Sequence, residues 1–312
     1  MGSKKYFIGG AFIGFVLLFS FLFTLPDGKL HIYFCDVGQG DGAYIKYPDG
    51  EDMLIDGGPN NKVLGCLGRY MPFYDRTIDV VVLTHPQKDH MQGLISVIDR
   101  YNVKYFVIGV EGNNTEGYKR LLLGIKNKNI MVKNLYKGDT IGFGEAKMKV
   151  MWPTREWVAK NVPMEQCSND TMTQCNNDTI AKSNNGAVLG LATDTELNDF
   201  SFYMHLSYGD FDALFTGDGD VRIQPLIESE NVLPDVEVLK FPHHGSRTGM
   251  MVEFLDKIKP ELSIISVGKN SYGHPTKEAI EILRNRDIKI LRTDEEGDIE
   301  VVTDGKGWEV MN

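Results

Sequence analysis

The chain is poor in cysteine, has no excess of positive charge and contains no internal repeat. Its four cysteines lack the spacing of metal ligands, which argues against a cysteine-based zinc module. The formal net charge of −10 argues against a broad basic surface that would hold nucleic acid by neutralising its backbone. It does not exclude a nuclease, because a bound metal and a few local cations can offset the field at a site. With no repeat and no linker, residues 29–312 are predicted to form one domain.

Two of the cysteines flank a short polar stretch. Cys167 and Cys175 are therefore candidates for a loop disulfide in an oxidising compartment. Cys35 ends an apolar strand and Cys66 lies in an expected helix. We expect these last two cysteines to be buried free thiols.

A long uncharged hydrophobic run occupies residues 6–25. Its twenty residues, at a rise of ~1.5 Å each, match a hydrocarbon core of ~30 Å, which predicts a transmembrane helix. Lys4 and Lys5 before it place the N-terminus in the cytoplasm and the following domain outside, held at the membrane. Residues 1–28 are thus predicted to be a cytoplasmic tip and an uncleaved signal anchor. The alternative is a cleaved signal peptide, which normally has a shorter apolar region and small residues before its cleavage site.

Residues 78–94, IDVVVLTHPQKDHMQGL, hold the most informative pattern in the chain. The β-branched run at 78–84 predicts a buried strand, which leads within six residues to His85, Asp89 and His90. A rigid strand end followed by an open turn can direct three ligands to one point. Imidazole and carboxylate together favour Zn²⁺, Mn²⁺ or Fe over Ca²⁺ or Mg²⁺. The competing interpretation is a capped helix start with surface histidines.

Four further apolar strands also end in an acid or an imidazole. They are residues 52–56, ending in Asp56; residues 213–215, followed by Asp218; residues 236–241, followed by His243 and His244; and residues 262–267, followed by a loop with Tyr272 and His274. Sites on sheets form at the carboxyl edge of the strands, so these side chains are expected to meet there. A repeated arrangement of this kind favours a metal site over isolated core histidines.

Several cations lie within a few residues of these motifs: Lys88, Lys240, Arg247, Lys269 and Lys277. Two interpretations are open for them. They either offset the negative charge of a substrate or form a solvated rim.

The remaining pattern alternates strands with helices. Strands are expected at 30–34, 43–47, 105–110, 147–152 and 202–207, helices at 61–70, 91–101 and 116–126, and a final hairpin at 298–302 and 308–310. Residues 154–199 are rich in Asn, Asp, Thr and Ser and are expected to form a polar loop insertion, either a functional lid or loosely ordered. The order of elements predicts a four-layer αββα body.

Six pieces of sequence carry a family resemblance: DVGQGD at 36–41, LIDGG at 54–58, THPQKDHMQGL at 84–94, FTGDGD at 215–220, FPHHGS at 241–246 and SVGKNSYGHP at 266–275. Together they resemble the metallo-β-lactamase fold superfamily, and within it the hydrolase domain of ComEC-like competence proteins and its free-standing relatives. The resemblance covers essentially all of residues 29–312. It implies the α/β sandwich expected above and a metal-dependent hydrolase. Nothing in the sequence resembles the many transmembrane helices of the competence channel, so a role as a DNA-uptake pore is not predicted.

The superfamily pattern H-x-H-x-D-H implies that His85, Asp89 and His90 are metal ligands. It also implies that Asp218 is a carboxylate bridging two ions, and that one histidine of the pair 243–244 is the next ligand. The sequence does not say which of the two it is.

Other positions are assigned roles around the metal. Asp56 resembles the strand-end acid that orients the ligands from behind, and His274 is expected to contact phosphate or donate a proton. Residues expected to bind substrate are Lys240, Ser246, Arg247 and Tyr272.

The chain departs from the family at Gln87, where relatives have histidine or aspartate. A neutral amide oxygen is a weaker ligand for a transition metal, and the downstream histidine usual for the first ion is not evident, since His205 lies within a strand. We therefore expect one firmly bound Zn or Mn ion, and a second that is weak or missing, with Gln87 as a weak third ligand.

The expected function is hydrolysis of a phosphodiester by metal-activated water, as in a nuclease, with Asp89 or Asp218 accepting the proton. DNA is the substrate that the resemblance implies, and a lipid- or wall-linked phosphoester such as phosphorylcholine is the alternative. Two further hypotheses are β-lactam or thioester hydrolysis, and a degenerate, membrane-tethered binding protein that has lost turnover. Gln87 is the feature that favours the binding protein. The sequence identifies no protein partner.

Overall fold

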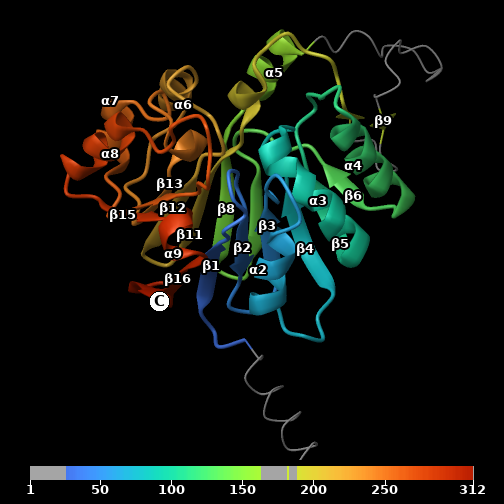
Figure 1. The fold of residues 1–312 in the computed structure, drawn as a ribbon, viewed down its shortest axis with the longest axis horizontal. Coiled ribbons are helices and arrows are strands. Elements are labelled where there is room, and N and C mark those ends of the chain that lie inside the picture. The colour runs from blue at the N-terminus through green and yellow to red at the C-terminus, as the bar shows by residue number, and fades with distance from the viewer. Residues whose placement is uncertain (1–25, 163–180, 183–187, 312) are drawn as a thin grey trace, which may run out of the picture.

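The computed structural model describes residues 26–162, 181–182 and 188–311 (Figure 1). The hydrophobic run at 6–25 and the pair Cys167 and Cys175 lie outside these residues, so the predicted anchor and loop disulfide are not described. Within the described residues, no helix combines the length and the apolar character needed to cross a bilayer.

Two large sheets make up the centre of the described residues (Figure 1). The first has the order β17-β16-β1-β2-β3-β4-β5-β6 and the second the order β15-β14-β13-β12-β11-β8-β7. Strands of the first sheet are β1 (Leu30–Phe34), β2 (Ala43–Lys46), β3 (Asp52–Ile55), β4 (Thr77–Val82), β5 (Asn102–Val107), β6 (Met131–Lys133), β16 (Ile299–Thr303) and β17 (Trp308–Met311). Strands of the second are β7 (Thr140–Phe143), β8 (Ala146–Trp152), β11 (Tyr203–Tyr208), β12 (Phe211–Phe215), β13 (Val238–Lys240), β14 (Leu262–Ile265) and β15 (Lys289–Arg292). A short pair, β9 (Ala181–Lys182) and β10 (Val188–Leu189), lies apart from them.

Helices cover the outer face of each sheet. The first sheet packs against α2 (Val63–Tyr70), α3 (Lys88–Arg100) and α4 (Glu116–Asn127) through one buried apolar cluster. The second packs against α6 (Gln224–Glu230), α7 (Val252–Ile258) and α8 (Lys277–Arg284) through another. A third cluster fills the space between the two sheets, so the layers follow the predicted order αββα.

Alternate side chains of a strand in the first sheet enter two different apolar clusters, one between the sheets and one under the helices. In β1, Leu30, Ile32 and Phe34 face the second sheet. Tyr33 and Cys35 face the helices instead, because successive side chains of a strand point to opposite faces. Both sets are buried, and His31, which is half-buried and paired with Glu300, interrupts an otherwise apolar strand.

Cys35 and Cys66 form a disulfide, with their Cα atoms 5.8 Å apart. The prediction of free thiols is therefore wrong, although the predicted burial of both residues is confirmed. Cys35 follows β1 on the side that faces the helices, and Cys66 lies on the buried side of α2. Their pairing depends on how α2 packs on the sheet, which the spacing of the two cysteines does not show.

The predicted strands and helices are confirmed, with boundaries that differ by a few residues. The largest consequence is at α3, which begins at Lys88 rather than after His90. Asp89 and His90 therefore lie in the first helical turn and not in the preceding loop. The predicted loop insertion at 154–199 contains α5 (Arg155–Asn161) at its start and the 3₁₀ helix η2 (Leu197–Phe200) near its end. Five of the described strands (β6, β7, β9, β10 and β15) and the helices α5 to α9, including α9 (Thr293–Glu296), were not predicted.

Candidate metal centre

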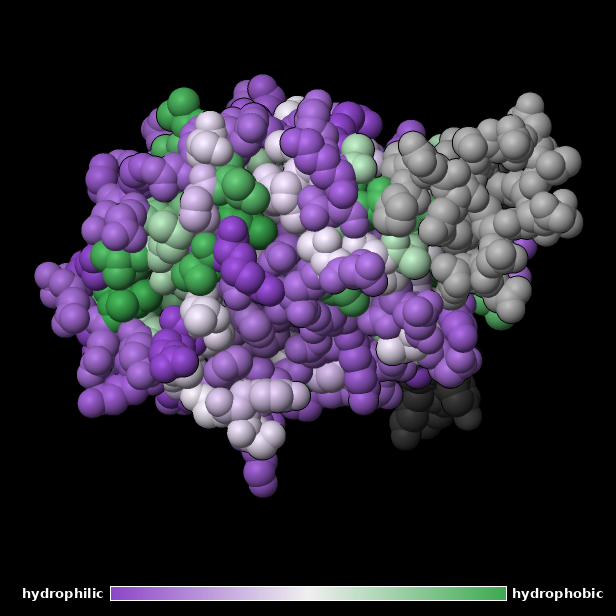
Figure 2. All heavy atoms as spheres, turned by 90° about the horizontal axis from the view of Figure 1, so that it is seen from above, coloured by the Kyte–Doolittle hydropathy of each residue, from purple (hydrophilic) through white to green (hydrophobic). Residues whose placement is uncertain are grey.

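The parallel strands of both sheets end at one rim of the sandwich. In the first sheet β3, β4 and β5 run parallel, and in the second β12, β13 and β14 do so. Their ends deliver the predicted site residues to this rim: Asp56 after β3, His85 after β4, Asp218 after β12, His243 and His244 in the 3₁₀ helix η3 (Pro242–Gly245) after β13, and His274 after β14. Figure 2 views the molecule from above, onto this rim, and most of the visible face is hydrophilic.

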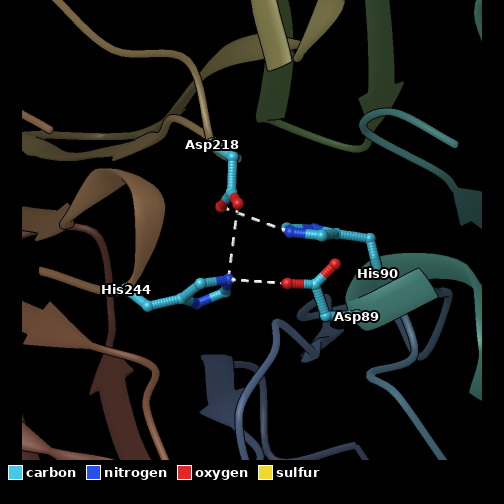
Figure 3. A group of neighbouring side chains, drawn as sticks. All are labelled: Asp89, His90, Asp218 and His244. Carbon is cyan, nitrogen blue, oxygen red and sulfur yellow. Dashed lines mark ion pairs between the residues drawn. The ribbon is translucent and has the colours of Figure 1, made fainter. Parts of the chain in front are cut away.

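Four side chains meet at the centre of the rim: Asp89, His90, Asp218 and His244 (Figure 3). One ligand atom from each lies within 4.8 Å of the other three. Asp218 Oδ1 is 3.2 Å from His90 Nε2, and Asp218 Oδ2 is 3.4 Å from His244 Nε2. His244 Nε2 is also 3.4 Å from Asp89 Oδ2. Asp218 thus touches both imidazoles, in agreement with the bridging position that the resemblance implies.

Several buried ligand atoms at this rim have no hydrogen-bond partner among the described residues. They include Nε2 of His85, of His90 and of His244, and Oδ1 of Asp218. Buried polar atoms are almost always paired, and a cation at the centre of the four-residue group would lie among the ligand atoms of His90, His244 and Asp218. Imidazole and carboxylate donors suit Zn²⁺, Mn²⁺ or Fe. The residues present therefore fit a transition metal ion.

Hydrogen bonds behind the two imidazoles direct their Nε2 atoms to the centre. His90 Nδ1 donates to Asp56 Oδ2 at 2.8 Å. The amide and hydroxyl of Thr84 both donate to the same carboxylate, each at 2.8 Å. His244 Nδ1 lies 2.9 Å from the carbonyl oxygen of Ser266. Such contacts fix the tautomer and the orientation of a metal-binding histidine, so Asp56 lies where the resemblance placed it.

Charged pairs hold the group together. Burial opposes a positive charge on either ring, but the charge of Asp218 raises the pKa of His90 and of His244 well above the usual value. Asp56 adds to this effect at His90, and Asp41 adds to it at His244. A bound cation would displace the proton from each Nε2.

Burial and the nearby positive charge of His90 lower the pKa of His85 to about 3, so its ring is neutral at pH 7. Burial alone would raise the pKa of Asp218, but the charges on His244 and His90 hold it well below its usual range. Burial likewise opposes ionisation of Asp89, and contact with His244 and the charge of His90 still lower its pKa. Both carboxylates are therefore ionised at neutral pH.

The structure distinguishes His244 from His243. The side chain of His244 is 2% exposed and belongs to the central group, whereas that of His243 is 29% exposed and its Nε2 lies 4.0 Å from Asp218. The ring of His243 instead faces His274, with the ring centroids 5.8 Å apart. Both histidines of the pair have left-handed backbone conformations, with φ of 51° and 53°. Such conformations are costly for residues other than glycine and are found most often at functional sites.

His85 and Gln87 lie beside the central group. The ring centroids of His85 and His90 are 4.1 Å apart, and Nε2 of His85 has no hydrogen-bond partner among the described residues. The side-chain nitrogen of Gln87 donates to Asn198 Oδ1, and lies 3.4 Å from a carboxylate oxygen of Glu196. The amide of Gln87 is thus held against the segment that contains η2.

The residues expected to bind substrate divide into two groups. Arg247 and Tyr272 are exposed at the rim, and the Tyr272 ring lies 5.9 Å from that of His274. Ser246 is nearly buried and contacts Thr248. Lys240 is only 4% exposed, so the prediction that it meets substrate is corrected. Its ammonium is instead occupied by the carboxylate of Asp41 and the carbonyl oxygen of Gly217.

Asp41 belongs to the site and was not predicted. Its carboxylate is 5% exposed, is ion-paired with Lys240, and lies 3.2 Å from His244 Nδ1 and 3.9 Å from His90 Nδ1. The available signal was its place as the last acid of the DVGQGD piece, which was interpreted only as a turn. Asp41, Asp56 and His90 form a second group with ligand-type atoms. The Nδ1 of His90 and the oxygens of Asp56 are engaged in hydrogen bonds, so this group supports the central four residues.

Comparisons with known proteins extend these findings. No family model matches the chain. It is 23% identical over 305 residues to ComE operon protein 3 of Bacillus subtilis, which covers 91% of this chain and 34% of that protein. A 104-residue stretch is 35% identical to competence protein ComA of Neisseria gonorrhoeae, covering 32% of this chain and 15% of that protein. The chain therefore spans about a third or less of the length of these relatives.

Among solved structures, the diiron β-hydroxylase CmlA of Streptomyces venezuelae has a TM-score of 0.50 and 13% identity, and covers 88% of this chain and 54% of that one. The metallo-β-lactamase fold protein YhfI of Bacillus subtilis has a TM-score of 0.49 and 12% identity, and covers 87% of this chain and 99% of that one. The two-sheet architecture, the converging motifs and the similarity to ComE operon protein 3 confirm the resemblance predicted from the sequence, to the metallo-β-lactamase fold and, within it, to ComEC-like proteins.

Proposed function

We propose that the chain is a metal-dependent hydrolase of phosphodiester bonds. The observation that carries this proposal is the convergence of Asp89, His90, Asp218 and His244 around a point to which buried, unpaired ligand atoms are directed. These four residues, with His85 beside them, would hold a Zn or Mn ion. When bound, such an ion supplies Lewis acidity and activates water at neutral pH.

The other steps of hydrolysis, which are proton transfer and contact with the phosphoryl group, are assigned to side chains of the site. Asp89 is the better proton acceptor, because its side chain is 32% exposed and reaches the open side of the site. Asp218 is 2% exposed and is occupied by both imidazoles, so its role is to hold the site together. His274 is half-buried and its Nδ1 has no partner among the described residues, which leaves it available to a phosphoryl oxygen or a leaving group.

Phosphodiesters are favoured over other substrates by the rim. Exposed Tyr272 lies two residues before His274, exposed Arg247 lies three residues after His244, and they offer a stacking surface and a cation to an anionic substrate. A relative named as a competence protein supports DNA as the substrate. The alternative within the same chemistry is a phosphoester such as phosphorylcholine.

The proposed location is the outer face of a membrane, with residues 6–25 as the anchor and the N-terminus in the cytoplasm. The buried disulfide Cys35–Cys66 supports this location, since disulfides persist in oxidising compartments. The described chain enters at the start of β1, and the metal rim lies at the opposite ends of the strands (Figure 1). The metal rim therefore lies at the end of the sheets that is far from the first described residues.

A direct test uses the full chain in detergent, with Mn²⁺ or Zn²⁺ added after removal of bound metal. Substrates are DNA, bis-p-nitrophenyl phosphate and nitrocefin. We expect metal-dependent cleavage of the first two, and loss of that cleavage in Asp218→Asn. Cleavage of nitrocefin alone would favour the β-lactam or thioester hypothesis, and no cleavage with tight metal binding would favour a binding protein.

A further inference from the structure

Lys240 is a buried cation beside the metal centre. It lies at the end of β13, is 4% exposed, and its Nζ donates to the carbonyl oxygen of Gly217 at 3.2 Å. Its other partner is the carboxylate of Asp41. A buried ammonium needs such partners, and both of these belong to segments that build the site. Gly217 directly precedes Asp218, and Asp41 contacts His244.

Asp41 connects this cation to a ligand. One carboxylate oxygen is paired with Lys240, and the other, Oδ1, lies 3.2 Å from His244 Nδ1. The backbone amide of Asp41 donates to the carbonyl oxygen of Asp89 at 3.1 Å. The loop is also fitted closely to α3, because a Cβ atom at Gly40 would lie 2.2 Å from the same oxygen. Asp41 is therefore held from two sides against two residues of the central group.

We propose that Lys240 and Asp41 form a buried ion pair that positions His244 for metal binding. This inference rests on the proposed metal centre. The carbonyl of Ser266 accepts a hydrogen bond from the ring nitrogen of His244, and the fixed negative charge of Asp41 beside that nitrogen strengthens Nε2 as a donor to a cation. Lys240 also places a positive charge beside Asp41 in the group Asp41, Asp56 and His90, so that group holds an internal cation and not a second metal ion.

The test is a double variant that removes both charges together, Asp41→Leu with Lys240→Met. Single variants would leave an unpaired buried charge and are expected to unfold, whereas apolar replacement of both partners preserves volume and neutrality. A milder double variant, Asp41→Asn with Lys240→Met, keeps an acceptor beside His244 but removes the charge. The matched control is Asp79→Asn with Lys104→Met, an acid–lysine pair on β4 and β5.

Zinc affinity is measured by competition with a chromogenic chelator on the full chain, and thermal unfolding in EDTA reports the stability of the ion-free protein. We expect Asp41→Leu/Lys240→Met to remain folded and to bind zinc roughly 10- to 100-fold more weakly. Asp41→Asn/Lys240→Met should be intermediate and the control unchanged. Wild-type affinity in the first double variant would overturn this inference alone. A wild-type chain that binds no zinc would overturn the metal centre, and this inference with it.

Discussion

Asp56 Oδ2 lies 2.8 Å from Nδ1 of His90, while the opposite nitrogen of the same ring points to Asp218. The acid comes from the end of β3 and the histidine from the first turn of α3, so two distant segments fix one ring. Asp56 is itself held by Thr84, and its backbone has a left-handed conformation with φ of 58°. This relationship makes the direction of His90 Nε2 a property of the fold and not of the bound ion.

Replacing Asp56 by asparagine should therefore weaken metal binding by roughly 10- to 100-fold, because the ring of His90 loses its charged acceptor. Chelator competition measures the affinity. Asp52→Asn is the matched control, since Asp52 is an equally buried acid of β3 that bonds to Tyr44 and Asp79, at the other end of the strand. Equal affinities in both variants would contradict the role assigned to Asp56.

The two adjacent histidines provide a sharper comparison. His244→Ala should abolish tight zinc binding, since its Nε2 contacts both Asp218 and Asp89. His243→Ala should leave zinc affinity within about twofold and lower kcat on bis-p-nitrophenyl phosphate, because His243 faces His274 at the exposed side of the site. The two variants serve as each other's controls, and the reverse pattern would show that the wrong histidine has been assigned to the metal.

Gln87 decides between an impaired enzyme and a binding protein. After exhaustive dialysis the wild-type chain should retain about one equivalent of metal, because a neutral amide is a poor ligand and its nitrogen is bonded to Asn198. Gln87→His should add binding of a second ion and increase cleavage of DNA or bis-p-nitrophenyl phosphate. Gln87→Asn, which keeps an amide, is the control. Two equivalents in the wild type would refute a single firm site, and no cleavage in any variant would support the binding protein.

Sequence reasoning found most of the central group but little of what surrounds it. Asp89, His90, Asp218 and the 243–244 pair follow apolar runs, so the convergence of parallel strands at one edge predicts their meeting. Nothing local distinguishes His244 from His243, because the choice depends on two left-handed residues in η3.

The residues that hold the metal ligands in place were harder to predict, because they meet through contacts between segments that are distant in the sequence. From the sequence, Lys240 is one of several lysines and arginines close to the motifs, and this position predicts an exposed cation at the rim. It is buried because β13 lies between β12 and β14 in the second sheet. Its partner Asp41 is far away in sequence. The pairing of Cys35 with Cys66 was missed for the same reason, since it requires the packing of α2 on the first sheet.

The disulfide Cys35–Cys66 should contribute measurably to stability. It closes a loop with a sequence separation of 31 residues. A loop of this length corresponds to about 3–4 kcal/mol in the chain-entropy description. Cys35→Ala with Cys66→Ala should lower the free energy of unfolding in urea by a comparable amount, measured in a background that already carries Cys167→Ala and Cys175→Ala. Because Cys35 directly precedes the loop that carries Asp41, zinc affinity should be measured on the same variant.

Glu111 should make the ion-free protein less stable as the pH rises. Its side chain is 1% exposed, and its Oε1 has no hydrogen-bond partner among the described residues. Burial raises its pKa from 4.5 to about 8. Between these values the unfolded chain has lost a proton that the folded chain still holds, so stability falls with increasing pH across this window, by up to about 1.4 kcal/mol per pH unit.

Urea unfolding in EDTA between pH 5 and pH 8 measures this slope. Glu111→Gln should flatten it and should raise stability most at the upper end, because the amide cannot ionise. The matched control is Glu116→Gln, in which the glutamate is exposed at the start of α4 and no buried charge is removed. The same slope in the wild type and in Glu111→Gln would show that the buried carboxyl of Glu111 is not the group that titrates.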